Sequence, residues 1–147
     1  MKRIENARIV YFDLGPIIRL LEFNVDYYPV ISQVLDLIYE KKIQMIASPV
    51  TLYSVCYKAF QHGDAALARQ YREFFTRSIG LSLREIDSEI ALAAAEFRAR
   101  HAVTFEESLQ LATAFHCGAD YVITENESWK TYLDTQVMTL DDLKATT

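Results

Sequence analysis

The stretch ARHAVTFEESLQLATAFHCGADYVITEN, residues 99–126, contains the signals that decide the fold. Thr104 followed by Glu107 predicts a capping box, in which a hydroxyl and a carboxylate satisfy the first free N–H groups of a helix. Apolar residues then recur at helical spacing as far as Gly118, a residue suited to a left-handed helix end. The nearly continuous apolar run at residues 121–124 is typical of a strand in a sheet that is covered on both faces.

The same alternation of strands and helices extends over the rest of the chain. Further strands are predicted at residues 8–12, 43–47, 81–86 and 136–140, and the one at 81–86 should lie nearer an edge because its apolar and polar residues alternate. Helices are predicted at residues 17–21, 28–38, 48–60, 64–77, 87–100, 104–117 and 129–133, with at most a helical turn in the polar tail. Right-handed helical crossovers between such strands predict an α/β fold, a three-layer α/β/α sandwich with a parallel five-stranded sheet.

Composition places the chain among folded globular proteins. It has 147 residues, of which 51% are hydrophobic and only 4 are Gly and 3 Pro, so we expect one domain over residues 1–147 and no disorder. No run of about 18 uncharged apolar residues predicts a membrane span, and the first residues lack the apolar run of a signal peptide. The 2 cysteines lack C-x-x-C spacing, which favours buried thiols in a reducing cytosol. We therefore expect a cytoplasmic protein without a membrane partner.

The net charge of −5 is mild. It argues against tight, charge-driven binding of duplex DNA, although a local basic face could still guide RNA. Arginines do gather in the middle of the chain, and we interpret them as a solvated helix surface.

Polar residues that follow the predicted strands are the candidates for a functional site, because the carboxyl ends of parallel strands share one rim. The candidates are Asp13 after the first strand, residues 51–54 after the second, Glu125, Asn126 and Glu127 after the fourth, and Glu106 and Glu107 at the start of the helix at 104–117. Oxygen ligands gathered around one depression suit Mg²⁺ or Mn²⁺. Two such ions can activate a water and stabilise the leaving oxygen in phosphodiester hydrolysis.

Each candidate also has a purely structural interpretation. Asp13 can accept N–H bonds at the start of the next helix, and the capping box accounts for Glu107. The acidic turn after the fourth strand can simply be solvated. Tyr53 and Tyr57, one turn apart, are expected to pack rather than to stack on bases. No glycine-rich phosphate loop and no Ser/His/Asp or Cys/His grouping stands out.

At these residues the pattern resembles the PIN domains, and among them the VapC-like toxins of bacterial and archaeal toxin–antitoxin pairs. The likeness covers nearly the whole chain and is carried by VYFD at residues 10–13, ASPVTL at 47–52, and the run from LQLATA at 109–114 through GADY at 118–121 to Thr124. It implies the same sandwich fold and a metal-dependent endoribonuclease that uses three or four carboxylates on Mg²⁺ or Mn²⁺.

The resemblance places the catalytic positions of the family on Asp13, Ser54, Glu107 and Asn126, with Asp13, Glu107 and Asn126 as the metal ligands. Only Asp13 keeps the usual residue, since Ser54 replaces a glutamate and both Glu107 and Asn126 replace aspartates. Mg²⁺ demands near-ideal octahedral geometry, so a lost charge and a longer side chain predict weak or lost cleavage. Two alternatives stay open: a neighbouring glutamate, at 106, 125 or 127, supplies a missing ligand, or the chain is a non-catalytic PIN module that binds RNA or a protein partner.

The resemblance also implies partners. An antitoxin-like protein and RNA are both possible ligands, and family members commonly pair as homodimers through helices. We expect a homodimer here, because aromatic residues that look exposed lie on or next to the helices at 28–38 and 64–77, namely Tyr27, Tyr28, Tyr71, Phe74 and Phe75.

Overall fold

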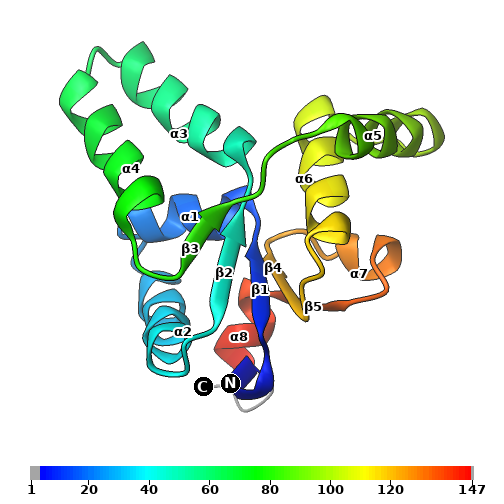
Figure 1. Cartoon of the computed structure of the whole chain (residues 1–147). Coiled ribbons are helices and arrows are strands. Elements are labelled where there is room, and N and C mark those ends of the chain that lie inside the picture. Colours follow the sequence, from blue (N-terminus) through cyan, green and yellow to red (C-terminus); the bar gives the residue numbers. More distant parts are fainter. Residues whose placement is uncertain (1–3, 147) are drawn as a thin grey trace.

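The computed structural model describes residues 4–146 and contains a five-stranded sheet with helices on both faces (Figure 1). The strands are β1 (Ile9–Phe12), β2 (Gln44–Ala47), β3 (Leu81–Leu83), β4 (Tyr121–Thr124) and β5 (Gln136–Thr139). All four strand pairings are parallel, in the order β3-β2-β1-β4-β5. The predicted parallel five-stranded sheet is therefore confirmed, with β3 at an edge.

The helices follow the predicted periodicity closely. After a short 3₁₀ helix, η1 (Ile4–Asn6), they are α1 (Leu14–Leu21), α2 (Tyr28–Glu40), α3 (Pro49–Gln61), α4 (Ala65–Arg77), α5 (Ser88–Arg100), α6 (Phe105–His116), α7 (Trp129–Tyr132) and α8 (Leu140–Ala145). The two largest differences from the predicted boundaries are that α1 begins three residues early, directly after Asp13, and that β3 ends at Leu83. The tail, predicted to hold at most a helical turn, forms the six-residue helix α8. The chain leaves β3 before residue 86 because Ile86 packs instead beneath α5 and α6.

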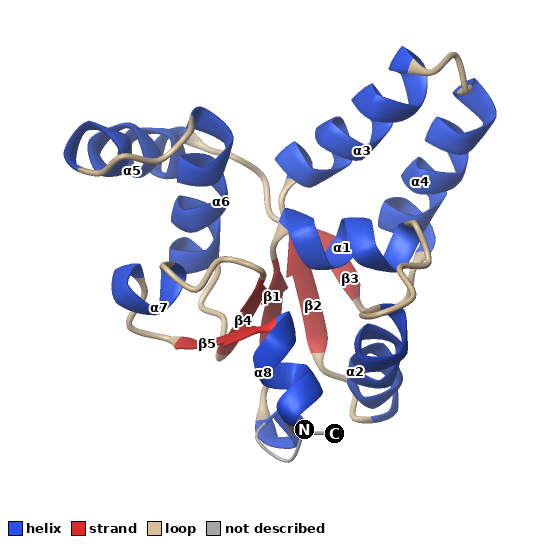
Figure 2. Cartoon of the chain, turned by 180° about the vertical axis from the view of Figure 1, so that it is seen from behind, coloured by secondary structure: helices blue, strands red, loops and turns tan. Residues whose placement is uncertain are grey.

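Alternate residues of each central strand enter opposite cores. Val10 and Phe12 face the core under α1, α2 and α8, whereas Tyr11 between them faces the core under α6 and α7. Figure 2 shows α1 and α8 in front of the sheet, on the face opposite α6. Burial on both faces explains why these strands read as continuous apolar runs, and it produces the predicted three-layer sandwich.

Several helix ends form as the sequence predicts. The side chains of Ser48, Asp64 and Asp87 accept N–H bonds at the starts of α3, α4 and α5. Gly118 has the positive φ of 70° that a left-handed helix end requires. A further, complete capping box occurs at α8, between Thr139 and Asp142, where no cap was predicted.

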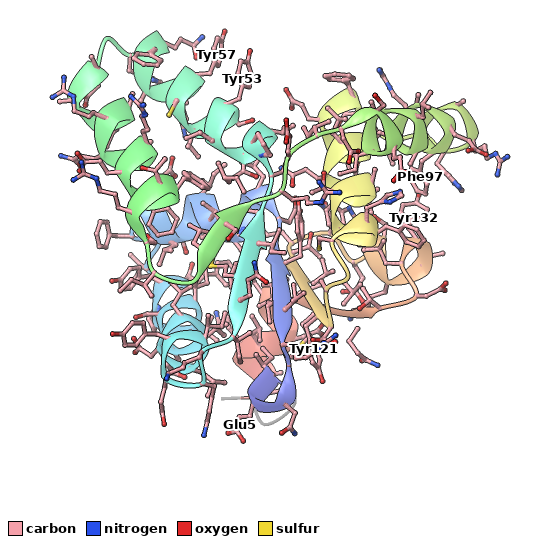
Figure 3. The ribbon with its side chains drawn as sticks, viewed as in Figure 1. Glu5, Tyr53, Tyr57, Phe97, Tyr121 and Tyr132 are labelled. Carbon is pink, nitrogen blue, oxygen red and sulfur yellow. The ribbon has the colours of Figure 1, made fainter. Side chains whose placement is uncertain are left out.

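The expected exposure of the aromatic residues proposed for a dimer surface is wrong. Phe75 is 2% exposed and belongs to the core, and the other four aromatics proposed for a dimer surface are half-buried against it. Tyr53 and Tyr57 are instead 63% and 54% exposed, and their rings stack on each other with centroids 5.9 Å apart. Figure 3 shows them side by side on α3, directed away from α4. The homodimer stays a prediction, and its apolar surface would have to lie elsewhere than on the buried faces of α2 and α4.

Two further expectations concern the burial of the cysteines and the absence of a membrane-spanning helix. Cys56 and Cys117 are free thiols, as expected, but they are half-buried rather than buried. Over residues 4–146, no helix has both the length and the apolar character needed to cross a bilayer.

Candidate functional site at the carboxyl rim of the sheet

A cavity of about 350 Å³ lies at the carboxyl ends of β1 and β4. Five of the predicted rim residues line it, namely Asp13, Glu106, Glu107, Glu125 and Asn126. Gly15, Ile18, Gln110 and Trp129 form much of the remaining wall. The expectation that these strand ends and the start of α6 meet at one depression agrees with this geometry.

The parallel ladder between β1 and β4 positions Asp13. Its backbone N–H donates to the carbonyl oxygen of Ile123 at 2.9 Å, so Asp13 lies beside Thr124. The Thr124 hydroxyl donates to Asp13 Oδ2 at 2.7 Å, and Asn126 Nδ2 approaches the same oxygen at 3.4 Å. Asp13 occupies the N-cap position of α1, but its side chain makes no capping bond. Asp13 is therefore not a regular helix cap, although the backbone N–H of Leu14, the first residue of α1, does stabilise its carboxylate.

Burial controls the acidity of Asp13. The residue is only 4% exposed, and loss of hydration raises the pKa of its carboxyl from 3.8 to about 6. The Thr124 hydroxyl opposes this shift by bonding the charged form, while the negative charges of Glu107 and Glu125 add to it. Asp13 therefore holds a proton more readily than an exposed aspartate does.

Thr124 also orients Asn126. The backbone N–H of Asn126 donates to the Thr124 hydroxyl oxygen at 3.0 Å. One buried hydroxyl thus connects Asp13 with the residue that stands where the family resemblance implies a second aspartate. The amide of Asn126 offers a dipole here, where a carboxylate would offer a full charge.

The carboxylate of Glu107 is held by Trp129, a residue outside the predicted site. The hydroxyl of Thr104 accepts the N–H of Glu107 at 3.1 Å, which is one half of the predicted capping box. The carboxylate of Glu107 does not complete that box, and its Oε1 accepts a hydrogen bond of 3.1 Å from the indole Nε1 of the fully buried Trp129. The capping box is therefore wrong in its second half, because α7 brings a donor to the mouth of the cavity.

Ser54 lies apart from the other candidates. It lines a second hollow of about 130 Å³, between α1, α3 and α4, together with Val55 and Lys58. Ile18 borders both hollows and separates them. The structure thus brings Asp13, Glu107 and Asn126 to one cavity and places Ser54 in the neighbouring hollow.

Two of the three glutamates proposed as substitute ligands already have partners. Glu125 Oε1 accepts from Arg19 Nε at 2.7 Å, and Glu127 Oε1 accepts from Lys130 Nζ at 2.8 Å. Glu125 lines the cavity and Glu127 does not. Of the three substitutes, only Glu106 and Glu125 are therefore placed at the rim.

The arrangement does not fit the Mg²⁺ or Mn²⁺ site that the resemblance implies. Such an ion needs several carboxylate oxygens that converge on one point. Within the described part of the chain, no three His, Cys, Asp or Glu side chains are grouped so that they could hold a metal. The carboxylates of Asp13, Glu107 and Glu125 are turned towards donors of the protein itself.

A buried amide network supports the floor of the cavity. Gln110 Nε2 donates to the hydroxyl oxygen of Thr51 at 2.7 Å, and the Tyr11 hydroxyl donates to Gln110 Oε1. Together with Arg19 and Trp129, Gln110 is a site residue that sequence reasoning missed. A polar residue inside an apolar helical face was the one available signal for Gln110, whereas Arg19 and Trp129 carry none, since their partners are distant in sequence.

Comparison with known proteins shows the fold. No protein-family model and no curated protein sequence matches the chain. The structure of VapBC2 from Rickettsia felis bound to a DNA fragment from its promoter contains a chain with a TM-score of 0.71 and 14% identity, over 89% of this chain and 98% of that one. A chain in a toxin–antitoxin complex from Klebsiella pneumoniae has a TM-score of 0.66 and 19% identity, over 89% of this chain and 97% of that one. A chain in the DNA-bound VapBC structure from Salmonella typhimurium has a TM-score of 0.65 and 17% identity, again over 89% of this chain and 97% of that one. The expected VapC-like fold is therefore confirmed along most of the chain.

Proposed function

We propose that this chain is a VapC-like PIN protein with weak or no ribonuclease activity, and that it acts by binding an antitoxin-like protein. One observation carries the proposal: three of the four acidic side chains of the rim bond to groups of the chain itself. Asp13 accepts from Thr124, Glu107 from Trp129 and Glu125 from Arg19. Each of these bonds occupies a carboxylate oxygen, and among the described residues no three acidic, His or Cys side chains are grouped to hold a cation.

Charge favours a protein ligand over RNA. The cavity is lined by four acidic residues, Asp13, Glu106, Glu107 and Glu125. Without a bound cation these carboxylates repel a phosphate backbone, whose binding depends on positive side chains. RNA binding at this rim is therefore the weaker alternative.

The hollow that contains Ser54 supports the protein partner. Its walls are mainly apolar side chains of α1, α3 and α4, among them Ile18, Leu21, Val55 and Leu67. An amphipathic segment laid across them would bury these side chains, which is the usual way that helices bind in grooves. The similar structures from Rickettsia felis, Klebsiella pneumoniae and Salmonella typhimurium are all toxin–antitoxin assemblies.

The activity is tested with purified chain, Mn²⁺ and a panel of structured and single-stranded RNAs. We expect the wild-type chain and an Asp13→Ala variant to leave the same RNA pattern. The variant controls for contaminating nucleases, because it removes the one family position at which this chain keeps the usual residue. Cleavage that requires Mn²⁺ and disappears in Asp13→Ala would show that the nuclease is active.

The partner is tested by sequencing the region upstream of the gene and co-expressing the chain with any small protein that is encoded there. We expect a stable complex that Leu67→Asp disrupts, because the new charge would enter the apolar hollow. Leu92→Asp on α5 is the matched control, since Leu92 is exposed and lies outside the hollow. Equal loss of the complex in both variants, or in neither, would count against the hollow as the binding site.

A further inference from the structure

The Arg19–Glu125 pair joins segments that are 106 residues apart, beside the rim cavity. Arg19 lies on α1 and Glu125 directly follows β4, with Nε and Oε1 separated by 2.7 Å. The two side chains are 41% and 34% exposed, and an ion pair this open adds little to the stability of a fold. The position of the pair therefore suggests a role in the charge of the cavity.

Gly15 provides the space in which Glu125 lies. A Cβ atom built on Gly15 would stand 2.7 Å from Glu125 Oε2 and 2.8 Å from its Cδ and Cγ. Gly15 and Arg19 are four residues apart on α1 and so share one face of the helix. A side chain at position 15 would push the carboxylate away from the guanidinium, so the glycine is part of the arrangement.

The lining of the cavity contains acidic residues and no basic residue. Asp13, Glu106, Glu107 and Glu125 all contribute to it, whereas no Lys or Arg is among the described residues that line it. Arg19 reaches this group from just outside through Glu125. Its hydrogen bond to that carboxylate raises the pKa of Arg19, so the positive charge is permanent.

We propose that the Arg19 guanidinium is a resident counter-ion of the rim, which supplies positive charge where a divalent cation otherwise would and so excludes Mg²⁺ and Mn²⁺. The inference rests on the proposed loss of metal-dependent chemistry, for which it gives a cause within the chain. While the pair is formed, Glu125 is unavailable as a ligand, and the guanidinium repels an incoming cation. A divalent ion and a unit charge ~6 Å apart repel enough to change an affinity about tenfold, even at the dielectric constant of water.

Binding of Mn²⁺ alone to the full chain tests the proposal. Isothermal titration and electron paramagnetic resonance would compare the wild type, Arg19→Gln and the double variant Arg19→Gln/Glu125→Gln. Lys58→Gln is the matched control, because it removes the same charge from another exposed ion pair, Lys58–Glu22, whose atoms are 2.8 Å apart. Both residues of that control pair line the other hollow.

We expect Arg19→Gln to bind Mn²⁺ at least about tenfold more tightly than the wild type, and both Lys58→Gln and the double variant to stay near the wild-type level. Arg19→Gln binding no better than Lys58→Gln would overturn the inference, as would tight Mn²⁺ binding by the wild type. The first of these results leaves the proposed function standing if the wild type also cleaves no RNA. Mn²⁺-dependent cleavage by the wild type would instead overturn the proposed function.

Nuclear magnetic resonance of the Arg19 Nε–H provides a second measurement that does not depend on metal or on the folding of the Arg19 variant. We expect a slowly exchanging signal in the wild type that is lost both in Glu125→Gln and in Gly15→Ala. The alanine has room to be accommodated, because the atoms that it would meet belong to the flexible Glu125 side chain. An unchanged signal in Gly15→Ala would refute the claim that the Glu125 side chain needs the space left by the glycine.

Discussion

Replacing Asp13 by asparagine should stabilise the chain at neutral pH, and the gain should fade as the pH falls. Asp13 is 4% exposed, and burial raises the pKa of its carboxyl to about 6. Because the pKa in the folded chain lies above the ordinary value of 3.8, the folded state binds the proton more tightly than the unfolded state. The resulting stability is complete below about pH 3.8 and is lost as the pH rises through about 6.

The size of the pKa shift of Asp13 determines how much stability the Asp13→Asn substitution should add. Keeping Asp13 ionised at pH 7.5 costs about 3 kcal/mol of folding free energy, since each unit of pKa is worth about 1.4 kcal/mol. Asparagine retains an acceptor for the Thr124 hydroxyl but introduces a buried amide donor that the carboxyl lacks, so we allow about 1 kcal/mol for that added donor. The Asp13→Asn variant should therefore be more stable by about 2 kcal/mol at pH 7.5 and by about zero at pH 4.5.

Urea unfolding at pH 7.5, 6.5, 5.5 and 4.5 measures this difference, with EDTA present so that no divalent ion competes for the carboxylate. Subtracting the wild-type free energy of unfolding from that of the variant at each pH cancels the titration of the other acidic groups. Asp36→Asn, on the exposed side of α2, is the matched control and should give a difference near zero throughout. An Asp13→Asn gain that is the same at pH 7.5 and 4.5, or a loss at pH 7.5, would refute the reasoning.

Three other substitutions test the packing around the rim, each by denaturant unfolding. Gln110→Met leaves the hydroxyls of Tyr11 and Thr51 without their buried partner and should lower the free energy of unfolding by about 3 kcal/mol. A loss below about 1 kcal/mol would mean that the network contributes little to stability. Trp129→Phe removes the indole donor to the cavity and should cost about 2 kcal/mol, with unchanged stability as the contrary result. Thr139→Ala breaks the capping box of α8 and should cost about 1 kcal/mol, whereas Thr139→Ser should restore most of it.

Local patterns in the sequence were enough for the strands, the helices and the rim. A nearly continuous apolar run such as 121–124 is typical of a strand covered on both faces. The caps at Ser48, Asp64 and Asp87 involve partners only two or three residues away. The meeting of Asp13, Glu107 and Asn126 was also predictable in outline, because parallel strands point their carboxyl ends to one side. Such inferences need no knowledge of which helices pack together.

The partners of the rim carboxylates depend on how distant elements pack. Glu107 looked like half of a capping box by spacing, yet α7 brings the Trp129 indole within 3.1 Å of it. Glu125 looked like part of a solvated turn or a substitute ligand, but α1 places Arg19 against it and leaves room above Gly15. Likewise, Phe75 is buried and Tyr53 exposed because α4 turns one face to the core and α3 turns another to solvent. These outcomes follow from small differences in helix placement between segments as much as 106 residues apart, and periodicity along the chain carries no information about such distances.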